Sequence, residues 1–292
     1  MSRHPRIAVI GGSGLYAMDE LTDVEELWIS TPFGPPSDSI TVGRLDDIEI
    51  AFLPRHGRGH VLSPTEVPSR ANIHALKTLG VNWIISVSAV GSLREDYRPL
   101  DLVLPDQIFD RTRARVTGFF EHGIVAHVSF AEPFCPRLRE TLWQSMSAAQ
   151  DFQSHLGGTY VCIEGPQFST KAESNIYRQL GCDVIGMTAI PEAKLAREAE
   201  MHYATIACIT DYDVWHETEE AVSLEVVVAN LQRNVQNAQR LIREATRALA
   251  APADWSACGC ESALQHAILT DRSAIAPEVL ERYSVLVGRY LK

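Results

Sequence analysis

The chain has 292 residues, of which 46% are hydrophobic and 22% are charged, and its formal net charge is −11. This hydrophobic fraction predicts a globular protein with a substantial core. The negative charge excludes a general nucleic-acid or anionic-membrane binder, because both need a basic surface. No apolar run reaches the ~18 residues of a membrane helix, and the first residues lead into a strand without the pattern of a signal peptide. We therefore expect a cytoplasmic protein.

Apolar runs predict strands at seven places along the chain: 6–10, 48–53, 82–88, 101–104, 159–163, 183–187 and 203–209. Helical patterns lie between several of them: 69–79, 135–149, 171–180, 191–200 and 224–250. This alternation predicts an α/β fold, a single domain with a central mixed, largely parallel β-sheet flanked by helices. We expect residues 1–250 to form that domain. Residues 251–292 are expected to be a C-terminal helical extension that packs on the domain or on a neighbouring subunit.

A glycine-rich turn, Gly-Gly-Ser-Gly at residues 11–14, follows the first predicted strand. Its glycines allow a tight backbone turn with exposed N–H groups, and Ser13 adds a hydroxyl donor, so the turn suits an anion. One interpretation is a dinucleotide fingerprint with Glu25 or Glu26 on the ribose, which would make the protein an NAD-dependent dehydrogenase. The other is a cradle for one inorganic phosphate. The turn alone leaves both open.

Polar or small residues follow the next two of these strands, at the sheet edge where ligands bind in an open α/β fold. Arg55 and His56 come after the second strand. An arginine fork beside a histidine suits an oxyanion, and a solvated basic loop is the alternative. Ser88 and Ala89 end the third strand, where small side chains let backbone amides approach a ligand. The alternative there is a tightly packed strand end.

Later segments suit a planar ring and a sugar. Phe168 lies in a polar turn and is expected either to stack on a ring or to be an ordinary core aromatic. Met187 and Thr188 precede a helix whose N-terminus favours an anion. Asp211 and Asp213 follow a fully apolar strand. A carboxylate there accepts from an exocyclic amine and a protonated carboxyl donates to a ring nitrogen, whereas solvated turn acids are the alternative.

The six cysteines show no zinc-binding spacing along the chain; they are residues 135, 162, 182, 208, 258 and 260. The first four lie in or beside apolar stretches and are expected to be buried thiols. Cys258 and Cys260 flank a glycine beyond the main apolar elements. We expect two reduced surface thiols there, with an exposed redox-active pair as the alternative.

In this order the six segments resemble the trimeric purine nucleoside phosphorylase family from about residue 6 to residue 250, and within it the branch that cleaves S-methyl-5′-thioadenosine. Four further stretches match as well: 31–34, 91–95, 106–112 and 131–136. The resemblance implies reversible phosphorolysis of methylthioadenosine to adenine and methylthioribose 1-phosphate. The protein would then be a glycosyltransferase, specifically a pentosyltransferase, of purine and methionine salvage. Inorganic phosphate would be a co-substrate, with no metal and no organic cofactor.

The resemblance also implies a role for each matching residue. The phosphate site would comprise Ser13, Arg55, His56, Ser88, Ala89 and Thr188. Ser88 and Met187 would flank the ribose, and Phe168 would lie along the purine. The catalytic pair would be Asp211, at the purine N7 and 6-amino group, and Asp213, which supports the amino side. If Asp211 donates to N7 near neutral pH, burial and Asp213 must raise its pKa.

The same resemblance implies a pocket shared between subunits. Val222 and Leu224 match the wall around the methylthio group. His127 and Leu286 match residues that the adjacent subunit contributes, so a homotrimer is implied, alone or as a dimer of trimers. Gln167 departs from the family, many members of which have arginine at that position.

Asp211 also separates the two kinds of purine substrate. Relatives that act on 6-oxopurine nucleosides carry asparagine at this position, so an aspartate favours a 6-amino purine. A mismatch between amide and carboxylate at a buried hydrogen bond costs about 1–3 kcal/mol. A 6-oxopurine nucleoside phosphorylase and a methylthioinosine phosphorylase are the alternatives.

Overall fold

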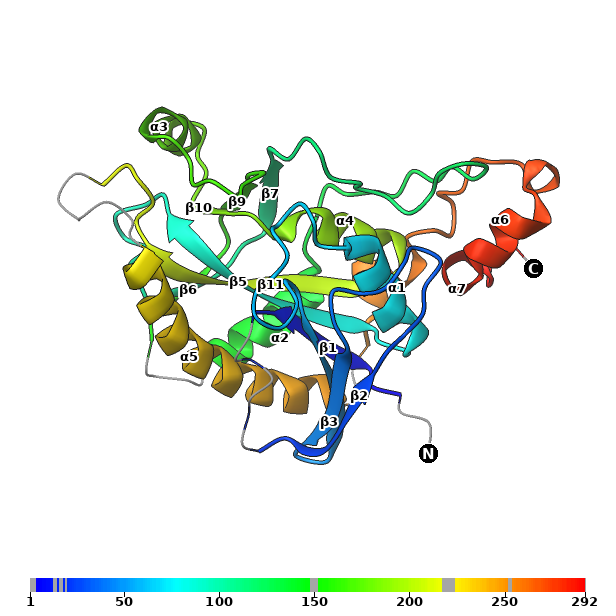
Figure 1. Ribbon diagram of the computed structural model, residues 1–292, viewed down its shortest axis with the longest axis horizontal. Helices are drawn as coiled ribbons and strands as arrows, with labels where there is room; N and C mark the ends of the chain where they lie inside the picture. Colours follow the sequence, from blue (N-terminus) through cyan, green and yellow to red (C-terminus); the bar gives the residue numbers. More distant parts are fainter. Residues whose placement is uncertain are drawn as a thin grey trace.

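Eleven strands form one mixed sheet in the part of the chain that the computed structural model describes: residues 4–12, 15, 18, 20–147, 152–216, 224–251 and 254–291. The strands are β1 (Ile7–Gly11), β2 (Thr22–Leu27), β3 (Ile40–Leu45), β4 (Ile48–Pro54), β5 (Trp83–Ser92), β6 (Leu102–Leu104), β7 (Gln107–Asp110), β8 (Ser154–Leu156), β9 (Thr159–Cys162), β10 (Val184–Gly186) and β11 (His202–Asp211). The predicted α/β fold with a mixed sheet between helices is confirmed (Figure 1).

Five longer helices pack around the sheet, and shorter ones follow in the C-terminal segment. They are α1 (Ser69–Thr78), α2 (Pro136–Ser147), α3 (Lys171–Gln179), α4 (Ala189–Glu198), α5 (Leu224–Ala250), α6 (Pro277–Arg282) and α7 (Ser284–Val287), with 3₁₀ turns η1 (Ser256–Cys258), η2 (Cys260–Ser262) and η3 (Arg272–Ala274). A helix that crosses a bilayer must be long and apolar throughout, and none in the described residues is.

The central strands run parallel, so their carboxyl ends meet at one edge of the sheet. β1 pairs in parallel with β4 and with β5, and β5 pairs in parallel with β11. The register sets Gly11 opposite Pro54, and Asp211 opposite Gly91. This edge therefore brings together the glycine turn, the basic loop and the acidic pair that are distant in sequence.

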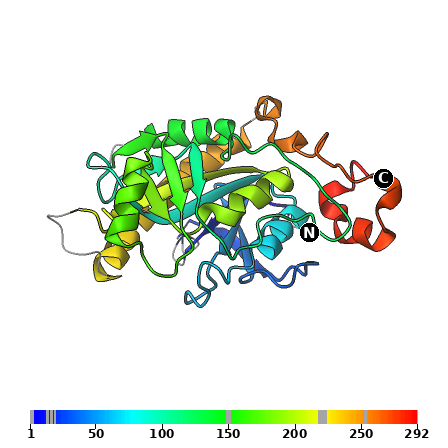
Figure 2. The same ribbon diagram turned by 90° about the horizontal axis from the view of Figure 1, so that it is seen from above.

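Side-chain alternation along the strands divides the core between the two sheet faces. In β1, Ala8 and Ile10 face the cluster that α1 and α4 cover, whereas Ile7 and Val9 face the one that α2 and α5 cover. Figures 1 and 2 show helices on both sides of the strands. A strand buried on both faces explains the continuous apolar runs of the sequence.

The C-terminal segment, residues 254–291, packs against the body of the same chain. Tyr283 and Val287 are buried in the cluster that includes α1. The Leu269 amide donates to the Val125 carbonyl at 2.9 Å. Helices α6 and α7 lie at one end of the molecule, beside α1 (Figure 1).

The burial of the cysteines is predicted correctly for four of the six. Those at 135, 162, 182 and 208 are buried thiols. The expectation of two surface thiols at the C-terminal pair is wrong, because Cys260 is buried and Cys258 is half-buried. The segment that carries them turns inward through η1 and η2, which its lack of regular apolar spacing does not indicate.

Candidate active site

The floor of the site is a buried ion pair between Arg55 and Glu192. Their side chains are 3% and 1% exposed, and Arg55 Nε lies 2.5 Å from Glu192 Oε1. Arg55 also donates to the Val87 carbonyl at 3.0 Å and to the Ser86 hydroxyl at 2.7 Å. Glu192 in turn accepts from the Tyr203 hydroxyl at 3.0 Å. The arginine fork predicted to clamp an oxyanion is thus engaged mainly by protein acceptors.

Two hydroxyl groups meet just beyond this ion pair. Ser88 Oγ on β5 lies 2.8 Å from Thr188 Oγ1, which precedes α4. Thr188 occupies the N-cap position of α4 but makes no capping hydrogen bond with its side chain. Tyr160 is fully buried, and its hydroxyl lies 3.2 Å from Ser88 Oγ. Ile190 is not helical (φ −109°, ψ 133°), so the regular part of α4 begins at Pro191. The structure therefore brings Ser88 and Thr188 together shortly before that helix.

His56, which follows Arg55 at the end of β4, is uncharged at neutral pH. Burial, reinforced by the Arg55 guanidinium, lowers the pKa of His56 to about 4. Its Nδ1 lies 2.8 Å from the Leu62 carbonyl and donates to it. The His60 ring stacks on it with centroids 4.3 Å apart. In this tautomer Nε2 of His56 is an acceptor.

The acidic pair lies farther along the same sheet edge. Asp211 Oδ1 accepts from the Asp213 amide at 2.8 Å, and Asp211 Oδ2 lies 2.6 Å from the Thr210 hydroxyl. A Cβ on Gly91 would come within 3.1 Å of Asp211 Oδ1 and 3.2 Å of Asp213 Cβ. Glycine at that position lets the two acids pack against β5.

Asp213 is buried in an uncommon backbone conformation. Its φ is +53°, a region that aspartate and asparagine tolerate better than most residues. The Ser169 hydroxyl donates to Asp213 Oδ2 at 2.9 Å. Burial nevertheless raises the pKa of Asp213 above its usual value. A carboxyl held in this way favours its protonated form more than an exposed one does.

Asp213→Asn is expected to show how the burial of the Asp213 carboxyl changes the stability of the protein with pH. A raised pKa means that Asp213 contributes stability below its unfolded pKa, near 3.8, and loses it as pH rises through the folded value. Asparagine does not titrate. The free energy of unfolding of the unmodified protein, relative to that of the variant, should fall as the pH rises above the unfolded pKa of Asp213, measured by urea denaturation. Asp47→Asn, at φ +65° with its carboxylate 98% exposed, is the matched control.

An arginine that sequence reasoning missed ties two loops of the site together. The Arg115 side chain is 3% exposed and donates to the carbonyls of Met187 and Glu164. Gly165 adopts φ +69°, and a Cβ there would collide with Met187 Sδ at 2.4 Å. Arg115 therefore fixes where Met187 and the turn before α3 approach each other. The signal that could have found it is a run in which every second residue, at 111, 113 and 115, is arginine.

Phe168 lies in this turn and is 51% exposed, so it is not a core aromatic. An exposed ring beside polar strand ends is available to a planar ligand. Gln167, the departure from the family, is exposed in the same turn. Ala89 lies on β5 next to Ser88 and is half-buried.

The remaining predicted residues have different places. Ser13 and Val222 lie outside the described residues, as does the side chain of Leu224. His127 is exposed, and its amide donates to the Ala267 carbonyl at 2.8 Å. Leu286 is only 3% exposed and packs in the core of its own chain, which contradicts an exposed role in a neighbour's pocket.

The structure does not support a dinucleotide site at the glycine turn. Among the described residues, the next element after β1 is β2, an edge strand antiparallel to β3, where a fingerprint requires a helix. Glu26 lies on that strand and accepts from Arg58 at 3.0 Å. Two hollows of about 600 and 680 Å³ on the described surface, one beside α3 and one beside residue 4, contain none of the predicted site residues.

Comparison with known proteins identifies the family. The model of the phosphorylase superfamily matches residues 6–247. The chain belongs to this superfamily. S-Methyl-5′-thioadenosine phosphorylases from Koribacter versatilis and Chloroflexus aurantiacus are 52% and 54% identical to this phosphorylase; each alignment covers 97% of this chain, and 96% and 98% of the relative.

Solved structures agree with that assignment. A methylthioadenosine phosphorylase from an antarctic soil metagenomic library has a TM-score of 0.91 at 51% identity and covers 98% of this phosphorylase and 99% of its own chain. The methylthioadenosine phosphorylase of Schistosoma mansoni in complex with adenine has a TM-score of 0.85 at 36% identity, covering 91% and 99%. The expected family is therefore confirmed.

Proposed function

We propose that this protein catalyses the reversible phosphorolysis of S-methyl-5′-thioadenosine to adenine and methylthioribose 1-phosphate. The observation that carries the proposal is the placement along β5 of the hydroxyl pair and of the acids. Ser88, which meets Thr188, and Gly91, which packs on Asp211, are three residues apart on that strand. Three residues of extended strand span about 10 Å, room for a nucleoside with phosphate at one end and its purine at the other. The names of the relatives support the same substrate.

Phosphate is the nucleophile in this proposal. The Ser88 and Thr188 hydroxyls donate to its oxygens at the N-terminus of α4, with Ser13 and the Ala89 backbone completing the site. His56 Nε2 accepts a hydrogen bond from the P–OH of monohydrogen phosphate. Arg55 does not contact the phosphate directly in this proposal. Paired with Glu192, it holds the ends of β1 and β5, and the phosphate packs against them. Phosphate held in this way stands ready to attack the anomeric carbon as it becomes cationic.

The leaving adenine is stabilised by the acidic pair. Thr210 Oγ1 lies 2.6 Å from Asp211 Oδ2 and 3.2 Å from the Val90 carbonyl oxygen. The hydroxyl has one proton, so it donates to one of these acceptors at a time. When Thr210 donates to Val90, a proton on Asp211 Oδ2 completes the network and can be passed to the purine N7. Asp213 supports the 6-amino group. Phe168 and Met187 enclose the purine and ribose, and Val222 and Leu224 the methylthio group.

We further propose that the enzyme works as a homotrimer in the cytoplasm, without an organic cofactor. His127 is the residue that supports a shared pocket, because it lies exposed on the long loop before α2. Leu286 is left out of that pocket. Free thiols persist in the reducing cytoplasm.

A substrate panel tests the proposed function. Methylthioadenosine, adenosine, methylthioinosine and inosine are each supplied with and without phosphate, and base release is measured by chromatography. Methylthioadenosine is expected to have the highest kcat/KM, with adenosine within about 10- to 200-fold, since an apolar pocket discriminates by only 1–3 kcal/mol. A preference for either inosine compound would replace the proposal by the 6-oxopurine alternative.

Thr188→Val tests the phosphate site with little change in side-chain volume. Loss of a hydrogen bond to a charged ligand should raise the KM for phosphate about 10- to 100-fold, with less effect on the KM for the nucleoside. Thr141→Val, which removes a hydroxyl bonded to the Arg137 carbonyl within α2, is the control. Equal phosphate KM values in Thr188→Val and the unmodified enzyme would remove Thr188 from the site.

A further inference from the structure

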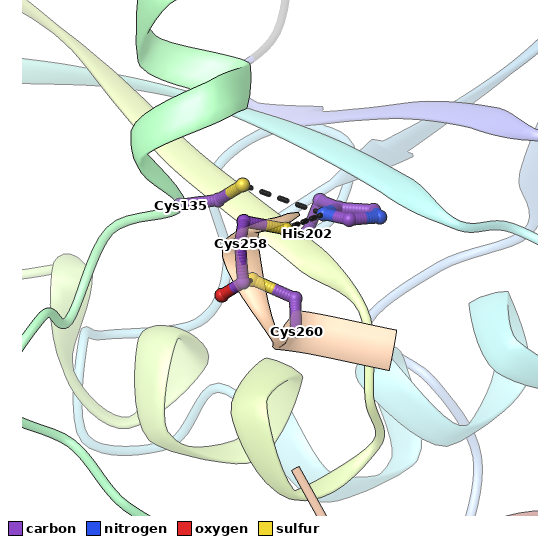
Figure 3. Close-up of side chains that lie close together, drawn as sticks. All are labelled: Cys135, His202, Cys258 and Cys260. Carbon is purple, nitrogen blue, oxygen red and sulfur yellow. Dashed lines mark hydrogen bonds between the residues drawn. The ribbon is translucent and has the colours of Figure 1, made fainter. Parts of the chain in front are cut away.

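Three cysteines and a histidine meet at the opposite end of β11 from the acidic pair. The potential ligand atoms of Cys135, His202, Cys258 and Cys260 all lie within 4.8 Å of one another. Cys135 immediately precedes α2, His202 begins β11, and the other two lie in η1 and η2 (Figure 3). Segments far apart in the sequence therefore place three thiols and one imidazole, all possible metal ligands, around one point.

The distances are close to those of a tetrahedral metal site. His202 Nδ1 lies 3.3 Å from Cys135 Sγ and 3.3 Å from Cys258 Sγ. A zinc ion with Zn–S bonds of about 2.3 Å and a Zn–N bond of about 2.0 Å sets its ligand atoms about 3.5 to 3.8 Å apart. Small side-chain rotations bring four atoms that span 4.8 Å to that spacing. Figure 3 shows His202 facing Cys135 and Cys258 with the same ring nitrogen.

Neighbouring groups orient the ligands as the neighbours of a metal site do. His202 Nε2 lies 3.2 Å from Glu261 Oε1, so the ring donates there and leaves Nδ1 as the ligand. A histidine between a carboxylate and a metal is a common arrangement. The Leu138 amide, in the first turn of α2, donates to Cys135 Sγ at 3.4 Å and helps to fix its position.

The surroundings are apolar and exclude most water. His202 is fully buried and its ring packs against Trp83 and Trp255, with ring centroids 6.0 Å and 5.1 Å away. Cys135 and Cys260 are each 1% exposed. A buried imidazole needs polar partners, and the thiols of this cluster are placed to share one with it.

We propose that Cys135, His202, Cys258 and Cys260 bind one structural zinc ion. Thiolate and imidazole ligands in tetrahedral geometry select zinc, and four protein ligands leave no open position for catalysis. Binding releases the thiol protons to solvent and involves no change of oxidation state. The ion is distant from the chemistry, because nine residues of β11, about 30 Å, separate His202 from Asp211.

The zinc would fasten the C-terminal segment to the body of the protein. Cys258 and Cys260 lie beyond residue 247, where the family match ends, whereas Cys135 and His202 lie within it. The segment after the site leads to Leu264, Ile275 and Tyr283, which fill the core beside α1. Loss of the metal should therefore loosen this segment first.

Metal analysis of the full-length protein, purified without chelators or an affinity metal, tests the proposal. About one zinc ion per chain is expected by mass spectrometry, falling at least tenfold in Cys258→Ser and Cys135→Ser. Cys182→Ser is the control, because that thiol is buried elsewhere. Replacement of zinc by cobalt should give the intense visible bands of a tetrahedral thiolate site, and a strong chelator should lower the Tm.

Two results would overturn the proposal, and neither depends on a variant that folds. One is a protein that holds no stoichiometric metal as purified or after reduction and exposure to zinc. The other is a chain whose intact mass, under non-reducing conditions, shows a disulfide among these three cysteines. Activity is not the readout, so the proposed phosphorolysis can fail while the zinc site stands.

Discussion

Asp211→Asn is expected to lower kcat/KM for methylthioadenosine about 100- to 1,000-fold, the usual effect of removing one group that stabilises developing charge on a leaving group. The amide keeps the volume of the carboxyl and can still accept from the Asp213 amide, but it cannot supply a proton to the purine. The measurement is steady-state kinetics at saturating phosphate. The Tm should change by only a few degrees, because the Asp213 amide contact survives.

The same variant tests the choice of purine. Asparagine donates to a 6-oxo group, so the ratio of kcat/KM for inosine to that for methylthioadenosine should rise at least tenfold. Asp183→Asn, which removes a carboxylate bonded to Arg94, provides the control for loss of charge. Kinetics of Asp211→Asn within twofold of the unmodified enzyme would show that Asp211 does not act on the purine.

Removing one partner of the Arg55–Glu192 pair is expected to have the largest effect on stability. Glu192→Gln or Arg55→Met leaves one buried charge uncompensated, which costs about 3–5 kcal/mol of unfolding free energy. The double variant Arg55→Met/Glu192→Leu should recover part of that loss, since neither charge then remains. Urea denaturation of the single and double variants measures the coupling as a double-mutant cycle.

An exposed pair of the same chemistry is the control. Arg137 and Glu140 lie on α2 with side chains 41% and 52% exposed, so Glu140→Gln should cost at most about 1 kcal/mol. The KM for phosphate of Arg55→Met, measured under conditions where the variant is folded, shows whether Arg55 also positions the phosphate in addition to stabilising the fold. If it equals that of Glu192→Gln, the two residues act on phosphate only through the shared ion pair. A cost below 1 kcal/mol for either single variant would contradict the buried-pair account.

The long strands that the sequence predicted bury apolar side chains on both faces, but β3 was missed although it is almost completely buried. β1, β5 and β11 give continuous apolar runs, and α5 has a regular helical pattern that matches its observed bounds. β2 was missed because it lies at the sheet edge with most side chains exposed, so it shows no alternation. The short strands β7 and β8 extend the sheet through backbone pairing, which depends on neighbours distant in the chain.

Candidate site residues were predictable where a strand end places them, and the residues that support them were not. Ser88, Thr188 and the acid at 211 follow apolar strands, and the structure brings them to one edge. Arg115 and Glu192 act through contacts 49 and 137 residues away, to Glu164 and Arg55. No local pattern encodes such contacts. The same reason hides the zinc ligands, whose spacing along the chain resembles no known metal motif.

The central claim is that inorganic phosphate displaces adenine from methylthioadenosine. Phosphorus NMR of the reaction, with adenine measured in the same sample, tests it most directly. We predict that one sugar 1-phosphate forms for each adenine released, and that adenine release without phosphate falls to background. Release of adenine at an unchanged rate without phosphate, with free methylthioribose as the second product, would make the protein a hydrolase and contradict the account.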